Sequence, residues 1–385
     1  VHKRYNMTAS ETALPINVDG SVVAPDELCD QVTIGFGTGE VTGEFVKEEV
    51  CLGGSQPRSS SDALPLPASC VDMHVVTAVD MSTQPFKSFG FDGILGLGLD
   101  SLALSHNFSF FGQFSDRSWA FAAQFAAFLT EGEDGEESEI AFGGHNPVRT
   151  LEPLSWAPVA LPEEGHWAVE ILAVRVGGVA LDFCRSGGCR GVVDTGTSHL
   201  GVPSPLDKEV ARLLTRNAHG FEDCRLIDAP IVEIELVGRN LSLSAENYMR
   251  RMPLREDIDV SSPTGVTMPR HQDEVEMQTS PRAMAAALTN QRRLRAEASG
   301  KPDKKAALQR YCRPKLMPVN LPAPLGPKVF ILGEPVLHRY YTVFDWSSRQ
   351  IGFGLAANRQ NTAARSQAAK PQTVALNQQE AVYVP

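Results

Sequence analysis

Short runs of Val, Ile, Leu and Phe, each closed by Gly, Pro, Asp or Asn, recur along the chain and limit its fold more than any other feature. Few windows show helical periodicity, and the 385 residues include 32 Gly and 26 Pro. Brief apolar runs between turn-forming residues are typical of β-strands. Because 42% of the residues are hydrophobic, the chain can fill a core in each of two ordinary domains. An all-β fold is therefore predicted.

Strand-like runs divide the chain at a boundary near Leu154 to Gly165. Val32 to Gly54 predicts a β-hairpin with a glycine-rich, mobile tip. Ser118 to Phe128 predicts a short amphipathic helix, and Ser204 to Thr215 a helix with Pro in its first turn. The remaining strand predictions are Val71 to Val79, Ile140 to Gly144, Trp167 to Val176, a pair within Ile231 to Leu243, Phe330 to Gly333, Tyr340 to Phe344 and Gln350 to Leu355.

The formal net charge of −11 is unevenly distributed. From Arg250 to Lys315 there are 14 Lys and Arg against 8 Asp and Glu, so this segment carries +6 and the remainder −17. Binding to phosphates needs a basic face, so nucleic acid is excluded as the main partner. An acidic body suits a protein that works at low pH, because protonation relieves its self-repulsion. The alternative is that the acidic surface only keeps the protein soluble.

Two segments lack the composition of a packed core. No aromatic residue lies between Tyr248 and Tyr311, and residues 252–311 are predicted to form a disordered insertion, with a helix within residues 282–298. Basic pairs at residues 250–251 and 292–293 are interpreted as solvated charge, with maturation cleavage as the alternative. The tail of residues 356–385 is rich in Ala, Gln and Asn and is also predicted to be disordered.

Seven Cys suggest an oxidising compartment. Their spacing predicts three loop-closing disulfides and leaves Cys29 to pair outside this chain; reduced cysteines in a cytosolic protein are the alternative. The predicted pairs are Cys51–Cys70, Cys184–Cys189 and Cys224–Cys312. Three Asn-x-Ser/Thr sequons, at Asn6, Asn107 and Asn240, also favour a glycoprotein of the secretory pathway. No run of about 18 apolar residues predicts a membrane span.

Asp194 carries the strongest chemical signal. The apolar residues Gly191, Val192 and Val193 lead to it, Gly196 removes bulk beside it, and Thr197 can donate a hydroxyl hydrogen bond to it. Peptide hydrolysis without metal, cofactor or covalent intermediate needs an activated water and a proton for the leaving nitrogen. Two carboxylates that share one proton provide both, and the aspartic proteases are the standard example.

The run Val192-Val193-Asp194-Thr195-Gly196-Thr197-Ser198 resembles the second active-site motif of the pepsin-like aspartic endopeptidases, a family that includes cathepsin D and pepsin. Other matches extend the resemblance over about residues 32–355, apart from the insertion. They are the small disulfide loop before the motif, the Trp156 to Trp167 inter-lobe strand, the closing segments Phe330 to Pro335 and Tyr340 to Asp345, and the run Phe91 to Gly98, which matches the corresponding run of the amino-terminal lobe.

The resemblance implies a bilobal fold, with an amino-terminal lobe at residues 1–153, a flap at residues 33–43 and a carboxy-terminal lobe at residues 154–355. It implies a monomer that cleaves extended peptides or proteins between apolar residues at acid pH, in a lysosome-like or vacuole-like compartment or after secretion. The implied roles are catalysis for Asp194; a grip across the lobe interface for Thr195; support of the carboxylate by Gly196, Thr197 and Ser198; substrate binding at the flap for Gly35, Phe36, Gly37 and Thr38; and side-chain pockets formed by Phe91, Ile94, His166 and Val192.

Some of these residues have plainer interpretations. His166 is interpreted mainly as an aromatic-packing histidine. The Phe91 to Gly98 run is interpreted as glycine packing within the core.

The sequence departs from the family in two ways. It holds no second Asp-Thr-Gly or Asp-Ser-Gly, and we interpret the amino-terminal lobe as incomplete, with the first catalytic Asp lying before Val1. Phe36 stands where the family usually has a flap Tyr, so one hydrogen bond is lost. A chain with one catalytic carboxylate is expected to be inactive by itself. The alternative function is a non-catalytic, peptide-binding pseudoprotease.

Overall fold

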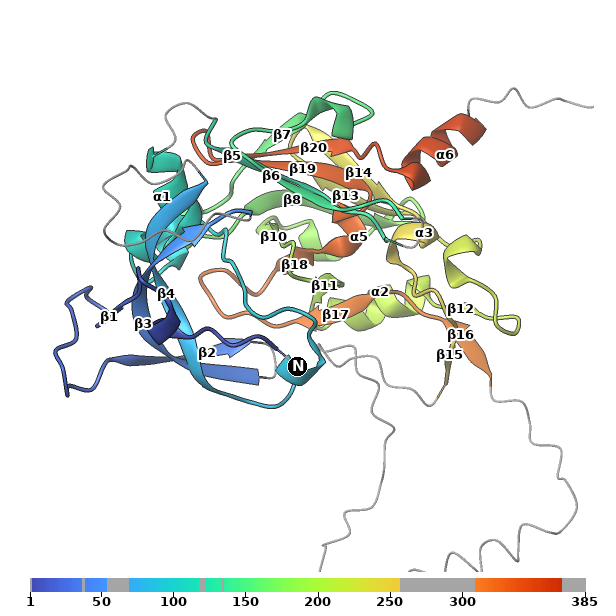
Figure 1. The fold of residues 1–385 in the computed structure, drawn as a ribbon. Coiled ribbons are helices and arrows are strands. Elements are labelled where there is room, and N and C mark those ends of the chain that lie inside the picture. Colours follow the sequence, from blue (N-terminus) through green and yellow to red (C-terminus); the bar gives the residue numbers. More distant parts are fainter. Residues whose placement is uncertain are drawn as a thin grey trace, which may run out of the picture.

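A computed structural model describes residues 2–36, 39–53, 69–117, 122–132, 135–256 and 309–368. β-strands in four sheets form most of the regular structure, and the helices are short (Figure 1). This confirms the prediction of an all-β fold. Among the described residues, no helix has both the length and the apolar character needed to cross a membrane.

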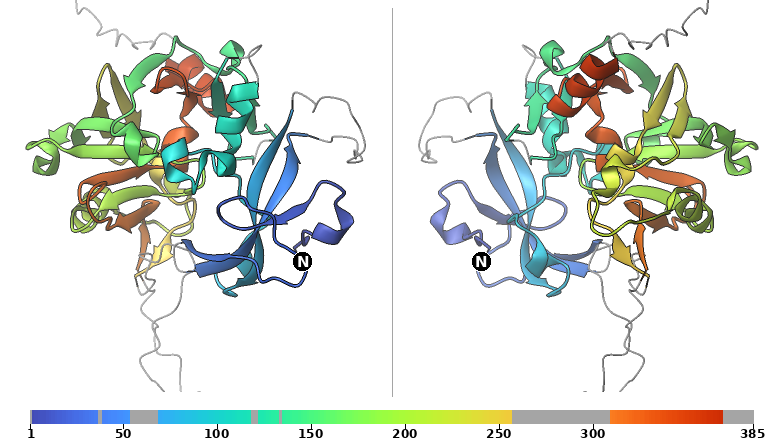
Figure 2. Two further views of the ribbon diagram at one scale, coloured as in Figure 1. Left: turned by 90° about the vertical axis from the view of Figure 1, so that its left-hand side faces the viewer. Right: turned by 90° about the vertical axis from the view of Figure 1, so that its right-hand side faces the viewer.

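The amino-terminal strands form a four-stranded antiparallel sheet on one side of the molecule (Figure 2). Strands β2 and β3 pair from Gln31 with Glu44 to Phe36 with Gly39, as the hairpin prediction requires. Gly37 and Thr38, at its tip, lie outside the described residues. The strands are β1 (Leu14–Ile16), β2 (Gln31–Phe36), β3 (Gly39–Cys51) and β4 (Cys70–Met81).

The largest sheet belongs to the carboxy-terminal half and has the order β14-β13-β8-β10-β18-β11-β17, with β9 paired to β8. Strand β10 is antiparallel to β8 and parallel to β18, so both of its edges are satisfied. The strands are β8 (Ala168–Val176), β9 (Val179–Ala180), β10 (Cys189–Val193), β11 (Leu200–Pro203), β13 (Val232–Leu236), β14 (Arg239–Leu243), β17 (Leu316–Val319) and β18 (Val329–Leu332).

A five-stranded sheet joins the two halves of the sequence in the order β6-β5-β19-β20-β7. Strand β5, from the first half, pairs with β19 near the end of the chain. The strands are β5 (Gln124–Phe128), β6 (Glu139–Phe142), β7 (Ser155–Pro158), β19 (Tyr340–Asp345) and β20 (Gln350–Leu355). The two proposed lobes therefore share a sheet.

Helix α1 packs its aromatic side chains against the five-stranded sheet. Phe110, Phe111 and Phe114 of α1 are buried, and the Phe111 ring lies 5.0 Å from Phe125 of β5 and 5.2 Å from Trp346. The α-helices are α1 (Phe110–Arg117), α2 (Leu206–Leu214), α3 (Ala245–Tyr248), α5 (Glu334–Leu337) and α6 (Arg359–Ala368). The 3-10 helices are η1 (Met7–Ala9), η2 (Phe86–Ser88), η3 (Asp100–Leu102), η4 (His106–Phe108), η5 (Pro147–Arg149), η6 (Pro162–Glu164), η7 (Asp182–Cys184) and η8 (Cys224–Leu226).

The structure corrects the helix prediction for residues 118–128. The helix, α1, lies earlier, and residues 124–128 form β5. Phe125 to Phe128 are all at most 2% exposed, because β5 lies between β6 and β19 and is covered on both faces. A strand buried on both faces has a continuous apolar sequence, which periodicity cannot distinguish from a buried helix.

The structure also narrows both predicted disordered segments. At the ends of the insertion, β15 (Leu254–Arg255) pairs with β16 (Arg310–Cys312), which in turn pairs with β12 (Arg216–Asn217). The tail contains α6, because the Asn358 carboxamide oxygen accepts from the Asn361 amide at 2.9 Å and caps the helix. Residues 257–308 and 369–385, with the predicted helix at 282–298 and the basic pair at 292–293, lie outside the described residues.

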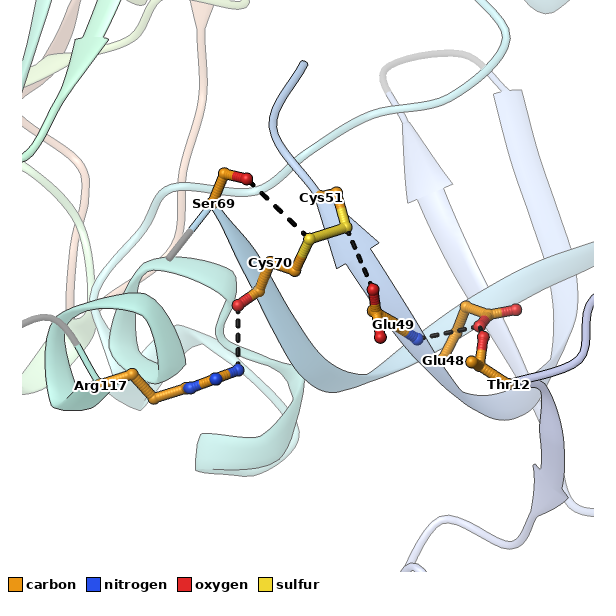
Figure 3. The surroundings of a disulfide bond; sticks show 7 residues. All are labelled: Thr12, Glu48, Glu49, Cys51, Ser69, Cys70 and Arg117. Atoms are coloured by element: carbon orange, nitrogen blue, oxygen red, sulfur yellow. Dashed lines mark hydrogen bonds between the residues drawn. A yellow bond between two sulfur atoms is a disulfide. The ribbon is translucent and has the colours of Figure 1, made fainter. Parts of the chain in front are cut away.

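Disulfides join Cys51 to Cys70, Cys184 to Cys189 and Cys224 to Cys312. Figure 3 shows the first of these where β3 ends and β4 begins, and there Arg117 of α1 donates to the Cys70 carbonyl oxygen at 3.0 Å. Glu49 lies beside both sulfurs, but bonded sulfurs are poor metal ligands. Cys29 has a free thiol whose pKa is raised by burial and by Glu44.

Candidate active site

Strand β10 positions Asp194. Val192 and Val193, its last two residues, are 8% and 5% exposed. The chain leaves the sheet at the next residue, where the Asp194 amide donates to the carbonyl oxygen of Leu332, 3.2 Å away. A buried central strand that ends abruptly brings a carboxylate to the end of the sheet with its backbone fixed.

Both oxygens of the Asp194 carboxylate accept a hydrogen bond. The Gly196 amide donates to Oδ1 at 2.9 Å, and the Thr197 hydroxyl donates to Oδ2 at 2.5 Å. The two donors come from the same turn and fix the plane of the carboxylate. The side chain is only partly buried, so the group remains accessible to a reactant.

Gly333 packs directly beneath this turn. A Cβ atom at residue 333 would lie 2.2 Å from the Thr197 carbonyl oxygen and 2.4 Å from that of His199. The Glu334 amide donates to the Thr197 carbonyl oxygen at 2.9 Å. Only glycine allows this approach, which gives a physical reason for the apolar-apolar-Gly pattern that ends at Gly333.

Two of the expected supporting side chains face outward. Thr195 is exposed, and its hydroxyl has no hydrogen-bond partner among the described residues. Ser198 is also exposed, and its hydroxyl lies 3.0 Å from Nδ1 of His199. The grip assigned to Thr195 therefore remains a prediction.

Val192 lies two positions before Asp194 on β10, and His166 lies close enough to feel the charge of Asp194. Val192 packs with Ala168 and Val329. Burial lowers the pKa of His166 below its ordinary value, against the attraction of the Glu164 and Asp194 carboxylates. The expected role of Val192 and His166 in a substrate side-chain pocket therefore stays a prediction.

Among the described residues the Phe91–Gly98 run is largely exposed, in contrast to its interpretation as glycine packing within the core. Phe91, Ile94 and Leu95 are 47%, 61% and 43% exposed. A Cβ atom at Gly93 or Gly96 would meet no described atom within 4 Å. Phe91 stacks on Phe89 with ring centroids 4.8 Å apart. The run is fixed at its far end, where Leu97 accepts a hydrogen bond from Trp167.

At the predicted flap, Gly35 and Phe36 form backbone pairs within the β2–β3 hairpin. Gly35 pairs with Glu40 in the hairpin, and a Cβ atom there would meet no described atom within 4 Å. Phe36 pairs with Gly39 at the last described position before the tip. A Cβ atom at Gly39 would lie 2.5 Å from Pro85, so the hairpin is packed against residues 82–86.

Sequence reasoning missed the contact between His199 and Arg250. The Arg250 guanidinium lies 3.1 Å from Nε2 of His199, which is 8% exposed. The two residues are 51 positions apart, and no local pattern connects them. Residue 250 was interpreted as solvated charge, with maturation cleavage as the alternative, and its partly buried side chain corrects the first interpretation.

Two cavities lie away from Asp194. One, of about 500 Å³, lies between α2 and the β16–β17 segment. The other, of about 400 Å³, is lined by residues of η8, α3 and the start of α6. Neither contains a residue expected at the site.

Comparison with known proteins agrees with this geometry. Residues 21–258 match the eukaryotic aspartyl protease family model. Cathepsin E of Rattus norvegicus is 24% identical over 335 residues, 86% of this chain and 67% of cathepsin E. Napsin-A of Mus musculus is 24% identical over 377 residues, 95% of this chain and 70% of napsin-A. Renin-2 of Mus musculus is 24% identical over 335 residues, 85% of this chain and 65% of renin-2. The chain thus spans about two thirds of the length of these relatives, and it belongs to the eukaryotic aspartyl protease family.

Proposed function

We propose that this protein is an aspartic endopeptidase and that Asp194 is one of its two catalytic carboxylates. The observation that carries the proposal is the double hydrogen bonding of Asp194 at the end of a buried central strand. This arrangement holds a carboxylate rigidly while leaving it accessible, as general acid–base chemistry requires.

In the proposed reaction, Asp194 and a second carboxylate share one proton and hold a water molecule between them. The ionised carboxylate removes a proton from the water as the oxygen attacks the peptide carbonyl carbon. The protonated carboxyl group donates to the carbonyl oxygen, and a proton then passes to the leaving nitrogen as the C–N bond breaks. Thr197 and Gly196 keep Asp194 oriented throughout.

We propose that the segment carrying the second carboxylate packs against the Phe91–Gly98 run. Its Ile94-Leu95-Gly96 repeats the pattern of Ile331-Leu332-Gly333, which pairs with β10 and supports the Asp194 turn. The repeat exposes its apolar residues and leaves open space at Gly96. We propose that a second strand ending in an Asp turn covers this run, so that the active protein includes residues beyond those printed.

The proposed substrate is an extended peptide bound by strand addition at the β2–β3 hairpin. Gly35, Phe36, Gly37 and Thr38 would offer backbone groups there. Phe91 and Ile94 on one side of the cut, and Val192 and His166 on the other, would favour apolar side chains. Phe36 lacks the hydroxyl that would steady the flap, which weakens closure by about 0.5 to 1.5 kcal/mol.

We further propose that the protein is a monomer that acts at acid pH, in a lysosome-like or vacuole-like compartment or after secretion. The three disulfides support an oxidising compartment. The sequence matches to cathepsin E and napsin-A give additional support.

Substitution Asp194→Asn in the intact protein tests the proposal. An amide cannot take a proton from water, so cleavage of an unfolded protein at acid pH should fall by roughly 10² to 10⁴-fold. Undiminished cleavage would reject Asp194 as a catalytic group.

The second candidate is a peptide-binding pseudoprotease. It is favoured by the single Asp-Thr-Gly of the printed chain and by Phe36 in the flap. Binding and cleavage separate the two functions. A pseudoprotease should bind an extended apolar peptide equally well before and after Asp194→Asn and should never cleave it. Peptide cleavage by the intact wild-type protein would exclude this candidate.

A further inference from the structure

His199 connects the Asp194 turn to Arg250, a cation 51 positions away in the sequence. Its Nε2 atom lies 3.1 Å from the Arg250 guanidinium, and its Nδ1 atom lies 3.0 Å from the Ser198 hydroxyl. A guanidinium group is always a hydrogen-bond donor, so Nε2 must be the acceptor. The imidazole is therefore neutral, with its proton on Nδ1, and it donates to Ser198.

Both ends of this connection are anchored. The His199 carbonyl oxygen packs against Gly333, and the next residue, Leu200, donates its amide to the Lys315 carbonyl oxygen at 2.9 Å. On the other side, the Arg250 amide donates to the Arg313 carbonyl oxygen at 3.1 Å. Within the part of the chain that the structure describes, the Nε atom of Arg250 is buried without a hydrogen-bond partner. His199 is thus the acceptor that satisfies a partly buried guanidinium.

The surrounding charges oppose a second positive charge at His199. Burial, followed by the charges of Arg250 and Lys315, lowers the pKa of His199 to about 4. Burial, followed by the charge of Arg313, lowers the pKa of Arg250 as well. On the nearby helix α5, Glu334 and His338 interact with each other, and Lys315 opposes the charge on His338. Protonated His199 would turn an N–H group toward the guanidinium and break the connection.

We propose that neutral His199 is a positioning residue that holds the Asp194 turn against Arg250, and that its protonation sets the lower pH limit of that turn's function. This inference rests on the proposed endopeptidase activity. His199 touches no reacting atom; it acts through Ser198 and the backbone next to Thr197.

Two substitutions separate positioning from simple packing. His199→Gln keeps one acceptor and one donor but cannot titrate in this range, whereas His199→Leu removes both groups. His74→Gln is the matched control, because His74 is also buried, also has a lowered pKa, and lies on β4 in the other half of the chain.

The first measurement is the rate of protein cleavage by the intact enzyme between pH 2.5 and 6.5. The rate for His199→Gln relative to wild type should rise below about pH 4, by up to tenfold per pH unit, because one proton inactivates only the wild type. His199→Leu should lower the rate at every pH, and His74→Gln should leave the shape of the profile unchanged. Superimposable profiles for wild type and His199→Gln would overturn the inference.

The second measurement needs no activity and so separates this inference from the proposed function. Nitrogen-15 NMR of the His199 ring should show the proton on Nδ1 and a titration midpoint near 4. At pH 5.5 the Gly196 and Thr197 amide signals should match those of wild type in His199→Gln and differ in His199→Leu. An Nε2 proton, or titration near the ordinary value of 6.5, would refute the inference. An intact enzyme that cleaves nothing but passes this NMR test would reject the proposed function alone.

Discussion

Trp167 donates its indole N–H to the carbonyl oxygen of Leu97, 2.8 Å away, and its own carbonyl oxygen accepts the amide of Val193. One residue, 5% exposed, therefore joins the Phe91–Gly98 run to the strand that delivers Asp194. The two parts of the proposed active site are therefore coupled through Trp167, by its side chain on one side and its backbone on the other.

Trp167→Phe should remove that coupling while keeping an aromatic ring against Phe125 and Phe344. Loss of one hydrogen bond and some packed volume should lower the free energy of unfolding by about 1 to 3 kcal/mol. Urea unfolding measures the change. Trp156→Phe is the control, because the Trp156 indole has no hydrogen bond to a described residue. Equal losses for the two variants would contradict the coupling.

Gly333→Ala should be far more costly than Gly96→Ala, although both glycines end an Ile-Leu-Gly sequence. The first places a methyl group 2.2 Å from the Thr197 carbonyl oxygen, and the second meets open space. We expect a loss of about 3 kcal/mol for Gly333→Ala and less than about 0.5 kcal/mol for Gly96→Ala in the printed chain.

The Gly333→Ala and Gly96→Ala variants also test whether the segment with the second carboxylate packs against the Phe91–Gly98 run. If another strand covers the Phe91–Gly98 run in the intact protein, Gly96→Ala should become destabilising there. If Gly96→Ala still leaves the free energy of unfolding almost unchanged in the intact protein, that packing is contradicted.

His106 should make stability depend on pH. Its two ring nitrogens lie 2.9 and 3.0 Å from Asp100 and Asp116, and the hydrogen bond to Asp100 is the main cause of its raised pKa. Because the folded pKa lies above the unfolded value of about 6.5, the stabilisation is complete below that value and is lost as pH rises through the folded pKa.

His106→Gln should abolish this loss. The side chains are substantially exposed, so the effect should be about 1 kcal/mol or less. The measurement is the difference in unfolding free energy between pH 5 and pH 8, with exposed His219→Gln as the control. A wild-type difference that persists unchanged in His106→Gln would disprove the assignment.

The disulfide Cys224–Cys312 should contribute more than Cys184–Cys189, because it closes a separation of 88 residues rather than 5. Chain entropy predicts about 4 to 5 kcal/mol for the longer loop and about 2 kcal/mol for the shorter one. Double Cys→Ala variants, unfolded in urea, measure both. A larger loss of stability on removing Cys184–Cys189 than on removing Cys224–Cys312 would show that loop entropy does not determine the contributions of these disulfides.

Local patterns in the sequence predicted much of this architecture. The glycine-rich hairpin, α2 after Ser204, and the strand pair around Gly238 all have turn or capping residues at their ends, so their signals are contained in a few neighbouring residues. The turn at Asp194 was recognisable for the same reason.

The failures involve distant contacts. The helix prediction for residues 118–128 is wrong because β5 is buried on both faces between β6 and β19, and β19 lies more than 200 residues away. The exposure of Ile94 and the contact of His199 with Arg250 likewise depend on segments that no local window includes. At Asn358, in contrast, a capping residue was present in the sequence, but the bias of the tail toward Ala, Gln and Asn obscured it.

The cleavage rate of an unfolded protein at acid pH decides whether Asp194 acts chemically. It is compared for three intact proteins: wild type, Asp194→Asn and Asp182→Asn. Asp182 is an exposed carboxylate 12 positions away, paired with Arg185. We expect Asp182→Asn to cleave like wild type and Asp194→Asn, still folded, to cleave roughly 10² to 10⁴-fold more slowly. Equal rates for wild type and Asp194→Asn would contradict a chemical role for Asp194.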